Sequence, residues 1–262
     1  MASIQCFQVE YEPRSVFWLI GMVVFAKQQV IAHRGASVVA PENTLASFHQ
    51  AKILGADCIE FDVMMNHEGD VYVFHDEHLG RTTNGQGLFY HATSKVLKSL
   101  DAGSWFSEQF QGEPIPTFER ALACLLNLGL HANIELKPVA DTSQQTTEAV
   151  LLQLNHYWPK DKPWPLISSF DVPSLAWCHE KMPELPLGLL LSEWDDGYQS
   201  AAKLDCVSVH LPHRCVTPQR VRAIKEQGQA VAVYTVNNKA LAEQLFIMGV
   251  DAVFSDHPDL LT

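Results

Sequence analysis

Basic residues are scarce in this 262-residue chain, which has 18 lysines and arginines against 30 aspartates and glutamates. The formal net charge of −12 would repel nucleic acid backbones and anionic membrane surfaces at long range, so we expect no nucleic acid partner. The six cysteines form no CxxC pair and no zinc-like Cys/His spacing. This pattern disfavours a zinc module and indicates a reducing, cytoplasmic compartment.

A hydrophobic run long enough to span a bilayer is also missing at the N-terminus. The apolar stretch at residues 16–26 is too short to cross a membrane as a helix. Acidic residues outnumber basic ones before it, and no clear small-x-small cleavage site follows it, which disfavours a targeting signal. We predict that residues 1–29 are an N-terminal extension of uncertain role, a packed segment or an over-extended start ahead of Met22, without stable membrane insertion.

Short β-rich runs recur along the rest of the chain. The strand candidates are residues 30–34, 58–65, 71–76, 132–137, 166–170, 187–191, 206–210, 230–236 and 251–255. Apolar residues at three- and four-residue spacing predict helices at 44–56, 146–158, 174–182, 219–228 and 239–249. Gly55, Gly228 and Gly249 end three of these helices and mark the return into the next strand.

One connection is too short to hold a helix. Glu68-Gly69 supplies a two-residue turn, so we predict that 71–76 pairs with 58–65 as an antiparallel hairpin. The eight remaining strands, joined mostly by helices, are the pattern of a (β/α)8 TIM barrel with a β-hairpin at its second strand. Residues 77 to about 116 break the rhythm, and we predict an insertion over one barrel face within a single domain at 30–262.

Acidic residues stand at the predicted carboxyl ends of strands, where such barrels carry their active sites. Glu60 and Asp62 are two positions apart and so face the same side of a strand, as do Glu135 and Lys137. Three carboxylates that converge at a barrel mouth would repel one another, and one hard divalent cation, Mg²⁺ or Ca²⁺, would relieve the repulsion. The alternative interpretation is a set of internal ion pairs with Arg34 and Lys137.

Two histidines and two cations complete the predicted site. His33 ends the first strand, and counting outward from the predicted turn pairs His75 with Asp62 on the same face. Two imidazoles near their unperturbed pKa can divide acid and base work beside a phosphate. The guanidinium of Arg34 and the ammonium of Lys137 suit the oxygens of such a phosphate.

Other polar and aromatic residues are weaker candidates. His210, Phe170 and Tyr234 stand near strand ends and could line the pocket or pack in the core or rim. Asn43 and Thr44 precede a helix that either could cap, and a structural role is at least as consistent with this position as substrate contact.

Eight short motifs follow one another in a specific order and spacing. They are His33-Arg34-Gly35-Ala36-Ser37, Pro41-Glu42-Asn43-Thr44, Gly55-Ala56-Asp57, Ile59-Glu60-Phe61-Asp62-Val63, Phe74-His75-Asp76, Arg81-Thr82-Thr83-Asn84-Gly85, Ile134-Glu135-Leu136-Lys137 and Val236-Asn237. From about residue 30 to the C-terminus the chain resembles the glycerophosphodiester phosphodiesterase family. It departs from that pattern at Tyr234, where many relatives carry tryptophan, a difference at the substrate end of the site.

The resemblance implies a barrel enzyme that hydrolyses deacylated phospholipids to sn-glycerol 3-phosphate and an alcohol with one divalent ion. It also implies a role for each of the seven charged site residues: acid/base catalysis by His33 and His75, metal binding by Glu60, Asp62 and Glu135, and phosphate binding by Arg34 and Lys137. The nucleophile stays open between water and the substrate's own glycerol hydroxyl. The head group, the physiological metal and the choice between monomer and homo-oligomer stay open as well.

Two other functions compete with this interpretation. A lipase of the same barrel type that acts on phosphoinositides or sphingomyelin would need an exposed apolar rim, and the acidic net charge disfavours it. A non-catalytic barrel that binds phosphate compounds or a protein could lose a histidine or a carboxylate without consequence, whereas this chain keeps them all. We therefore predict metal-dependent hydrolysis of glycerophosphodiesters by two histidines in acid-base catalysis.

Overall fold

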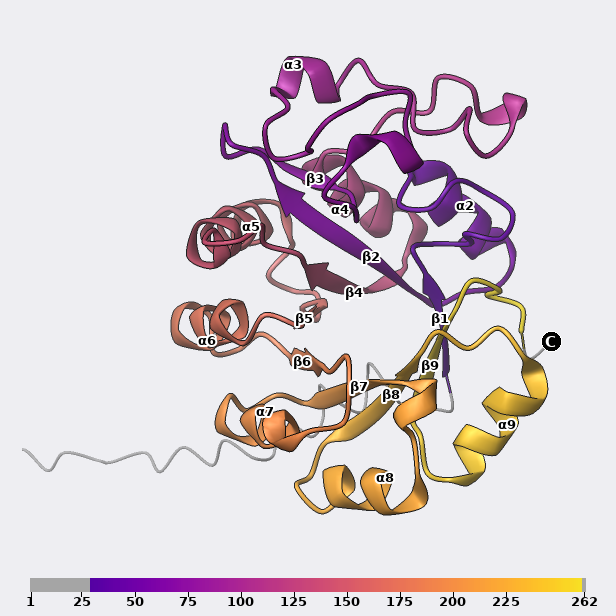
Figure 1. Ribbon diagram of the computed structural model, residues 1–262, viewed down its shortest axis with the longest axis vertical. Coiled ribbons are helices and arrows are strands. Elements are labelled where there is room, and N and C mark those ends of the chain that lie inside the picture. Colours follow the sequence, from indigo (N-terminus) through magenta and orange to yellow (C-terminus); the bar gives the residue numbers. More distant parts are fainter. Residues whose placement is uncertain (1–28, 261–262) are drawn as a thin grey trace, which may run out of the picture.

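The computed structural model describes residues 29–260, and within this range eight parallel strands form a closed barrel (Figure 1). The barrel strands are β1 (Gln29–His33), β2 (Cys58–Met65), β4 (His131–Leu136), β5 (Leu166–Ser169), β6 (Leu187–Leu190), β7 (Ser208–Pro212), β8 (Ala230–Tyr234) and β9 (Ala252–Ser255). The ring closes because β1 pairs with both β2 and β9. The predicted (β/α)8 barrel is confirmed, and the predicted extension at 1–29 lies outside the described residues apart from Gln29, which begins β1.

Helices surround the barrel and connect its strands (Figure 1). They are α2 (Leu45–Ile53), α4 (Phe118–Leu128), α5 (Ser143–Tyr157), α6 (Val172–Lys181), α7 (Gln199–Lys203), α8 (Pro218–Lys225) and α9 (Lys239–Ile247). The structure confirms the five predicted helices, whereas α4 and α7 were not predicted. Helix α4 buries Phe118, Leu122 and Leu125 at helical spacing, so its pattern was present in the sequence. Helix α7 is too short for such a period to show.

Strand β2 explains how the chain brings charge into the barrel. Ile59, Phe61 and Val63 point outward into the main apolar core, where the ring of Phe61 lies 5.2 Å from that of Phe48. Burial of each of these side chains contributes roughly 1.5–3 kcal/mol, which fixes the face that the strand turns outward. Because strand residues alternate, Glu60 and Asp62 then point into the barrel.

The hairpin after β2 exists, but its predicted register is wrong by one residue. Strand β3 (Val71–Val73) is shorter than predicted and pairs Met65 with Val71, which leaves a longer loop in which Gly69 has a φ of 86°. The Asn66 side chain stabilises this loop, since its Oδ1 accepts hydrogen bonds from the backbone N–H groups of Glu68 and Asp70. Phe74 therefore lies opposite Asp62 and donates its N–H to the Asp62 carbonyl.

The segment after β3 packs against one side of the barrel, beside β3 and α4 (Figure 1). It contains η1 (Leu79–Arg81), α3 (Ser94–Leu97) and η2 (Glu108–Phe110). A small second core, which includes Leu79 and Phe89 of this segment together with Met64 and Tyr72 of the hairpin, joins the segment to the hairpin. The boundaries of the insertion at 77 and about 116 stay a prediction.

The loop between β1 and α2 is held in an unusual backbone conformation. Arg34 and Gly35 have φ values of 55° and 81°, and a Cβ at Gly35 would lie 2.8 Å from the carbonyl carbon of Ser47. The Ser47 hydroxyl donates to the Arg34 carbonyl at 2.9 Å, so α2 and the turn are joined at this point. Only glycine fits at position 35 without displacing the loop that carries Arg34.

Gly35→Ala should lower the free energy of unfolding by about 3 kcal/mol, because the left-handed backbone and the collision with Ser47 both oppose a side chain. The matched control is Gly55→Ala. Gly55 has a φ of 88°, but nothing lies within 4 Å of the position that a Cβ would take, so this change should cost about 1 kcal/mol. Urea denaturation measures both, and equal losses would contradict the close-packing argument.

Candidate active site

Three carboxylates meet inside the mouth of the barrel. Glu60 and Asp62 come from β2, and Glu135 comes from β4, where it pairs in register with Asp62. One oxygen of each carboxylate lies within 4.8 Å of the others, and all three residues are buried. The structure thus brings together the three acidic residues that the sequence predicted as metal ligands.

The three carboxyl groups do not share the same electrostatic environment. Burial, followed by repulsion from Asp62 and Glu135, raises the pKa of Glu60 well above its usual value. Burial and the Asp62 charge raise the pKa of Glu135 to about 7. For Asp62, burial acts in the same direction, but Arg34, His75 and Lys137 outweigh it and lower the pKa. A divalent cation fits this oxygen set, because it would favour the charged form of all three groups.

Arg34 and Lys137 lie beside the carboxylates. The Nε of Arg34 is 3.3 Å from Asp62, and its backbone N–H donates to Glu60 at 3.0 Å. The Nζ of Lys137 lies 3.2 Å from Glu135. The ion pairs of the alternative interpretation are therefore present. They set three carboxylates against two of the described cations, so the cluster carries a net negative charge when all three carboxylates are ionised.

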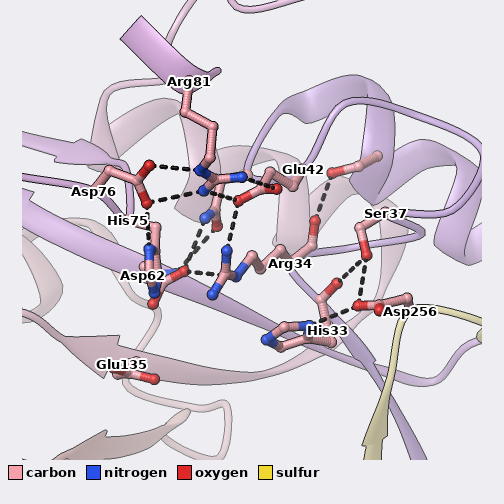
Figure 2. Close-up of polar contacts among 12 residues, drawn as sticks. His33, Arg34, Ser37, Glu42, Asp62, His75, Asp76, Arg81, Glu135 and Asp256 are labelled. Atoms are coloured by element: carbon pink, nitrogen blue, oxygen red, sulfur yellow. Dashed lines mark hydrogen bonds and ion pairs between the residues drawn. The ribbon is translucent and has the colours of Figure 1, made fainter. Parts of the chain in front are cut away.

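His33 is oriented by a carboxylate from the opposite end of the barrel sequence. Its Nδ1 lies 2.7 Å from Asp256, which directly follows β9 (Figure 2). Because an ionised carboxylate can only accept, Nδ1 carries the proton and the Nε2 lone pair is left for chemistry. That Nε2 lies 4.0 Å from Glu60, at the edge of the acidic cluster. Ser37 and Asn237 donate to Asp256 and fix its position.

His75 has the same kind of partner. Its Nδ1 lies 2.6 Å from Asp76, so its Nε2 is also left unprotonated when the ring is neutral. Burial lowers the pKa of His75, as do Arg34 and Lys137, while Asp62 and Asp76 oppose the shift. The hairpin does not set His75 opposite Asp62 as predicted. The chain leaves β3 after Val73, and His75 approaches the cluster from that exit.

Several residues of the site were missed or misjudged in the sequence. Asn43 does not cap α2, a role that Thr44 fills; its amide instead binds Asp62, with Nδ2 2.8 Å from Oδ2. Glu42 accepts from Arg34 at 2.6 Å and also binds Arg81. Asp256 stands at a strand end like the residues that were predicted, so the same rule applied to the last strand would have found it.

An open cavity of about 530 Å³ lies beside the cluster. Its walls include His75, Asp76, Glu135, Lys137, Ser169 and Phe170. Phe170 is 42% exposed and lines the cavity, one of the two alternatives that the sequence left open for it. The ring of Tyr234 packs edge-on against Phe170 with the centroids 6.0 Å apart. The Tyr234 hydroxyl donates to the Leu191 carbonyl at 2.6 Å, so Tyr234 supports the wall from behind.

His210 does not line this cavity. The predicted strand ended at His210, but β7 continues to Pro212, which places His210 in mid-strand with no exposed surface. Its Nε2 lies 2.9 Å from the Ser208 hydroxyl, and the absence of a side chain at Gly188 leaves room for the ring. Burial lowers the pKa of His210 to about 3, so it is a neutral part of the barrel interior.

Comparison with known proteins gives consistent matches. The model of the glycerophosphoryl diester phosphodiesterase family matches residues 33–260. Glycerophosphodiester phosphodiesterases of Caldanaerobacter subterraneus and Bacillus subtilis are each 35% identical, covering 90% and 88% of this chain and 96% and 84% of their own lengths. A solved structure of an Oleispira antarctica phosphodiesterase in complex with the product sn-glycerol-3-phosphate is 40% identical, with a TM-score of 0.86, and the match covers 89% of this chain and 95% of that one.

The raised pKa values predict how the metal-free protein responds to pH. A carboxyl group whose pKa is higher in the folded state favours folding below its unfolded pKa and loses that contribution as the pH rises toward its folded pKa. Protein freed of metal by a chelator should therefore lose stability as the pH rises from about 4, the unfolded pKa of a glutamate, to about 7, the pKa of Glu135 in the folded protein.

Glu135→Gln removes one of the repelling charges and should raise the stability of chelated protein at pH 8 on the order of 2 kcal/mol. Urea denaturation at pH 5 and pH 8, with chelator or with Mg²⁺, measures the effect. Added Mg²⁺ should stabilise the unaltered protein more than the variant. A variant that is less stable than the unaltered protein in chelator at pH 8 would refute the repulsion.

Proposed function

The chain belongs to the glycerophosphoryl diester phosphodiesterase family and is a phosphodiesterase, and we propose that it hydrolyses glycerophosphodiesters to sn-glycerol 3-phosphate and an alcohol. The observation that carries this proposal is the convergence of three buried carboxylates beside two histidines, each oriented by a further carboxylate. The product complex of the Oleispira relative supports the choice of sn-glycerol 3-phosphate as the common product.

The phosphodiester group is held by positive charge at the barrel mouth. Arg34 presents a planar fork of donors and Lys137 a compact ammonium group, and both lie next to the carboxylates. Glu60, Asp62 and Glu135 would hold one divalent ion, for which Mg²⁺ and Ca²⁺ are both suitable by their preference for oxygen ligands. When bound, the ion supplies Lewis-acid polarisation of the phosphodiester oxygens.

The two histidines divide the proton transfers. With Nδ1 of each ring bound to Asp256 or Asp76, the Nε2 atoms of His33 and His75 are the groups that exchange protons with the substrate. One neutral imidazole removes the proton of the attacking hydroxyl or water, and the other, which starts as the imidazolium, gives its Nε2 proton to the departing alcohol. The carboxylate partners stabilise the imidazolium that forms in the first step.

We further propose the cytoplasm as the compartment of this enzyme. The five cysteines that the structure describes are all buried and free of disulfides, which suits a reducing environment. Among the described residues, no helix is both long enough and apolar enough to cross a membrane. The substrate is then a small diester delivered from the surrounding solution.

The proposed reaction can be tested with a panel of glycerophosphodiesters that carry choline, ethanolamine, inositol or glycerol as the alcohol. We expect release of sn-glycerol 3-phosphate from at least one of them, loss of activity in chelator, and recovery when Mg²⁺ or Ca²⁺ is restored, because the acidic cluster lacks charge balance without the ion. A coupled assay for sn-glycerol 3-phosphate measures the product. If no substrate gives metal-dependent product, the proposed function is wrong.

His75→Ala should lower kcat by about 10²–10⁴-fold, since it removes one of the two proton-transfer groups. Metal binding and the thermal unfolding midpoint should stay near their original values, because His75 is not one of the three clustered carboxylates. The control is His156→Ala, an exposed histidine on α5 that should leave kcat unchanged. Near-normal turnover by the His75 variant would reject the assignment.

A further inference from the structure

Arg81 joins two carboxylates at the edge of the site. It ends η1, in the segment after β3, and its side chain reaches between Asp76 and Glu42 (Figure 2). Its Nε and Nη2 donate to the two oxygens of Asp76 at 2.5 and 2.9 Å. Its Nη1 and Nη2 donate to the two oxygens of Glu42, both at 2.8 Å. One guanidinium thus makes paired contacts with two acidic groups.

Each of these acidic groups holds a different part of the reaction machinery. Asp76 accepts from Nδ1 of His75 at 2.6 Å, and Glu42 accepts from Nη1 of Arg34 at 2.6 Å. An unbroken chain of contacts therefore runs from the proton-transfer group His75 through Arg81 to the phosphate-binding group Arg34 (Figure 2).

The geometry requires a planar fork at position 81. Arg81 keeps 46% of its side chain exposed, whereas the side chains of Glu42 and Asp76 keep 14% and 22%. Without a cation between them, the two acidic groups would repel each other in this partly buried setting. A lysine supplies the charge but only one nitrogen, so it cannot hold both carboxylates through two oxygens each.

We propose that Arg81 is a positioning residue that sets the orientation of His75 through Asp76 and of Arg34 through Glu42. It acts through these carboxylates, without contact with the substrate. The inference rests on the proposed function, since it assumes that His75 transfers a proton and that Arg34 binds the phosphate. Through Arg81, the segment after β3 then influences both proton transfer by His75 and phosphate binding by Arg34.

The test is a comparison of kcat and KM among matched variants on the best glycerophosphodiester of the panel. Arg81→Ala should lower kcat about 10–100-fold and raise KM several-fold, as expected when residues that orient catalytic groups are lost. Asp76→Ala should act mainly on kcat and Glu42→Ala mainly on KM. Arg81→Lys should recover part of both losses.

Double variants separate positioning from direct substrate contact. In the Asp76→Ala background, adding Arg81→Ala should change kcat by less than about threefold, because the link to His75 is already broken. In the Glu42→Ala background, adding Arg81→Ala should likewise leave KM nearly unchanged. A full additional loss of kcat in the Asp76→Ala background, or a full additional rise of KM in the Glu42→Ala background, would overturn the proposal, because Arg81 would then act without that partner.

The control for loss of a surface cation is Lys225→Ala. Lys225 contacts both oxygens of Asp251 at 2.5 Å at the other end of the barrel, and its removal should leave kcat and KM unchanged. If Arg81→Ala does not fold, as judged by its thermal unfolding, Arg81→Lys decides the question. Values within twofold of the unaltered enzyme in both kcat and KM would overturn the proposal.

A readout without turnover distinguishes failure of this proposal from failure of the proposed function. The ¹⁵N chemical shifts of the His75 ring report its hydrogen bond at Nδ1, and calorimetry with sn-glycerol 3-phosphate reports binding by Arg34. Arg81→Ala should change the His75 shifts and weaken binding of this compound about tenfold. Unchanged His75 shifts and an unchanged affinity for sn-glycerol 3-phosphate would overturn the positioning role of Arg81. An unaltered enzyme that is inactive on every substrate of the panel would refute only the proposed hydrolysis of glycerophosphodiesters.

Discussion

Mutual repulsion among three buried carboxylates is the constraint on which the rest of the site depends. Glu60, Asp62 and Glu135 are carried into the barrel because the opposite faces of β2 and β4 are needed for the apolar core. Arg34 and Lys137 offset part of the charge, and the remainder accounts for the fit to a divalent cation. The same surplus of negative charge would repel a phosphate ligand unless these cations and a bound divalent ion offset it.

Much of this arrangement was readable in the sequence, because strand geometry is local. Alternation predicted that Glu60 and Asp62 share one face of 58–65 and that Glu135 and Lys137 share one face of 132–137. The barrel architecture predicted that the two pairs could point into one site, and the structure brings the three carboxylates together. The count of strands and the helical spacing between them predicted the closed barrel. His33 and Phe170 also lie where the strand ends predicted them.

The features that were missed depend on contacts that no local pattern specifies. The observed hairpin register differs from the predicted one by one residue, because the side chain of Asn66 stabilises a longer loop. The sequence pattern was equally consistent with a two-residue turn. The strand predicted to end at His210 continues to Pro212, because an apolar run does not define where its strand ends, and His210 packs in the barrel interior, one of the two predicted alternatives. Arg81 and Glu42 stand 39 positions apart in the sequence, and only the folded chain shows that they meet.

The pairing of His33 with Asp256 spans 223 positions and joins the first strand of the barrel to the residue after the last. Contacts of such long range form late, since most of the chain must be ordered before they can be made. During synthesis, the residues of the carboxylate cluster are therefore added early. Asp256, which orients His33, is added only after β9. The contact that orients His33 therefore forms together with closure of the barrel.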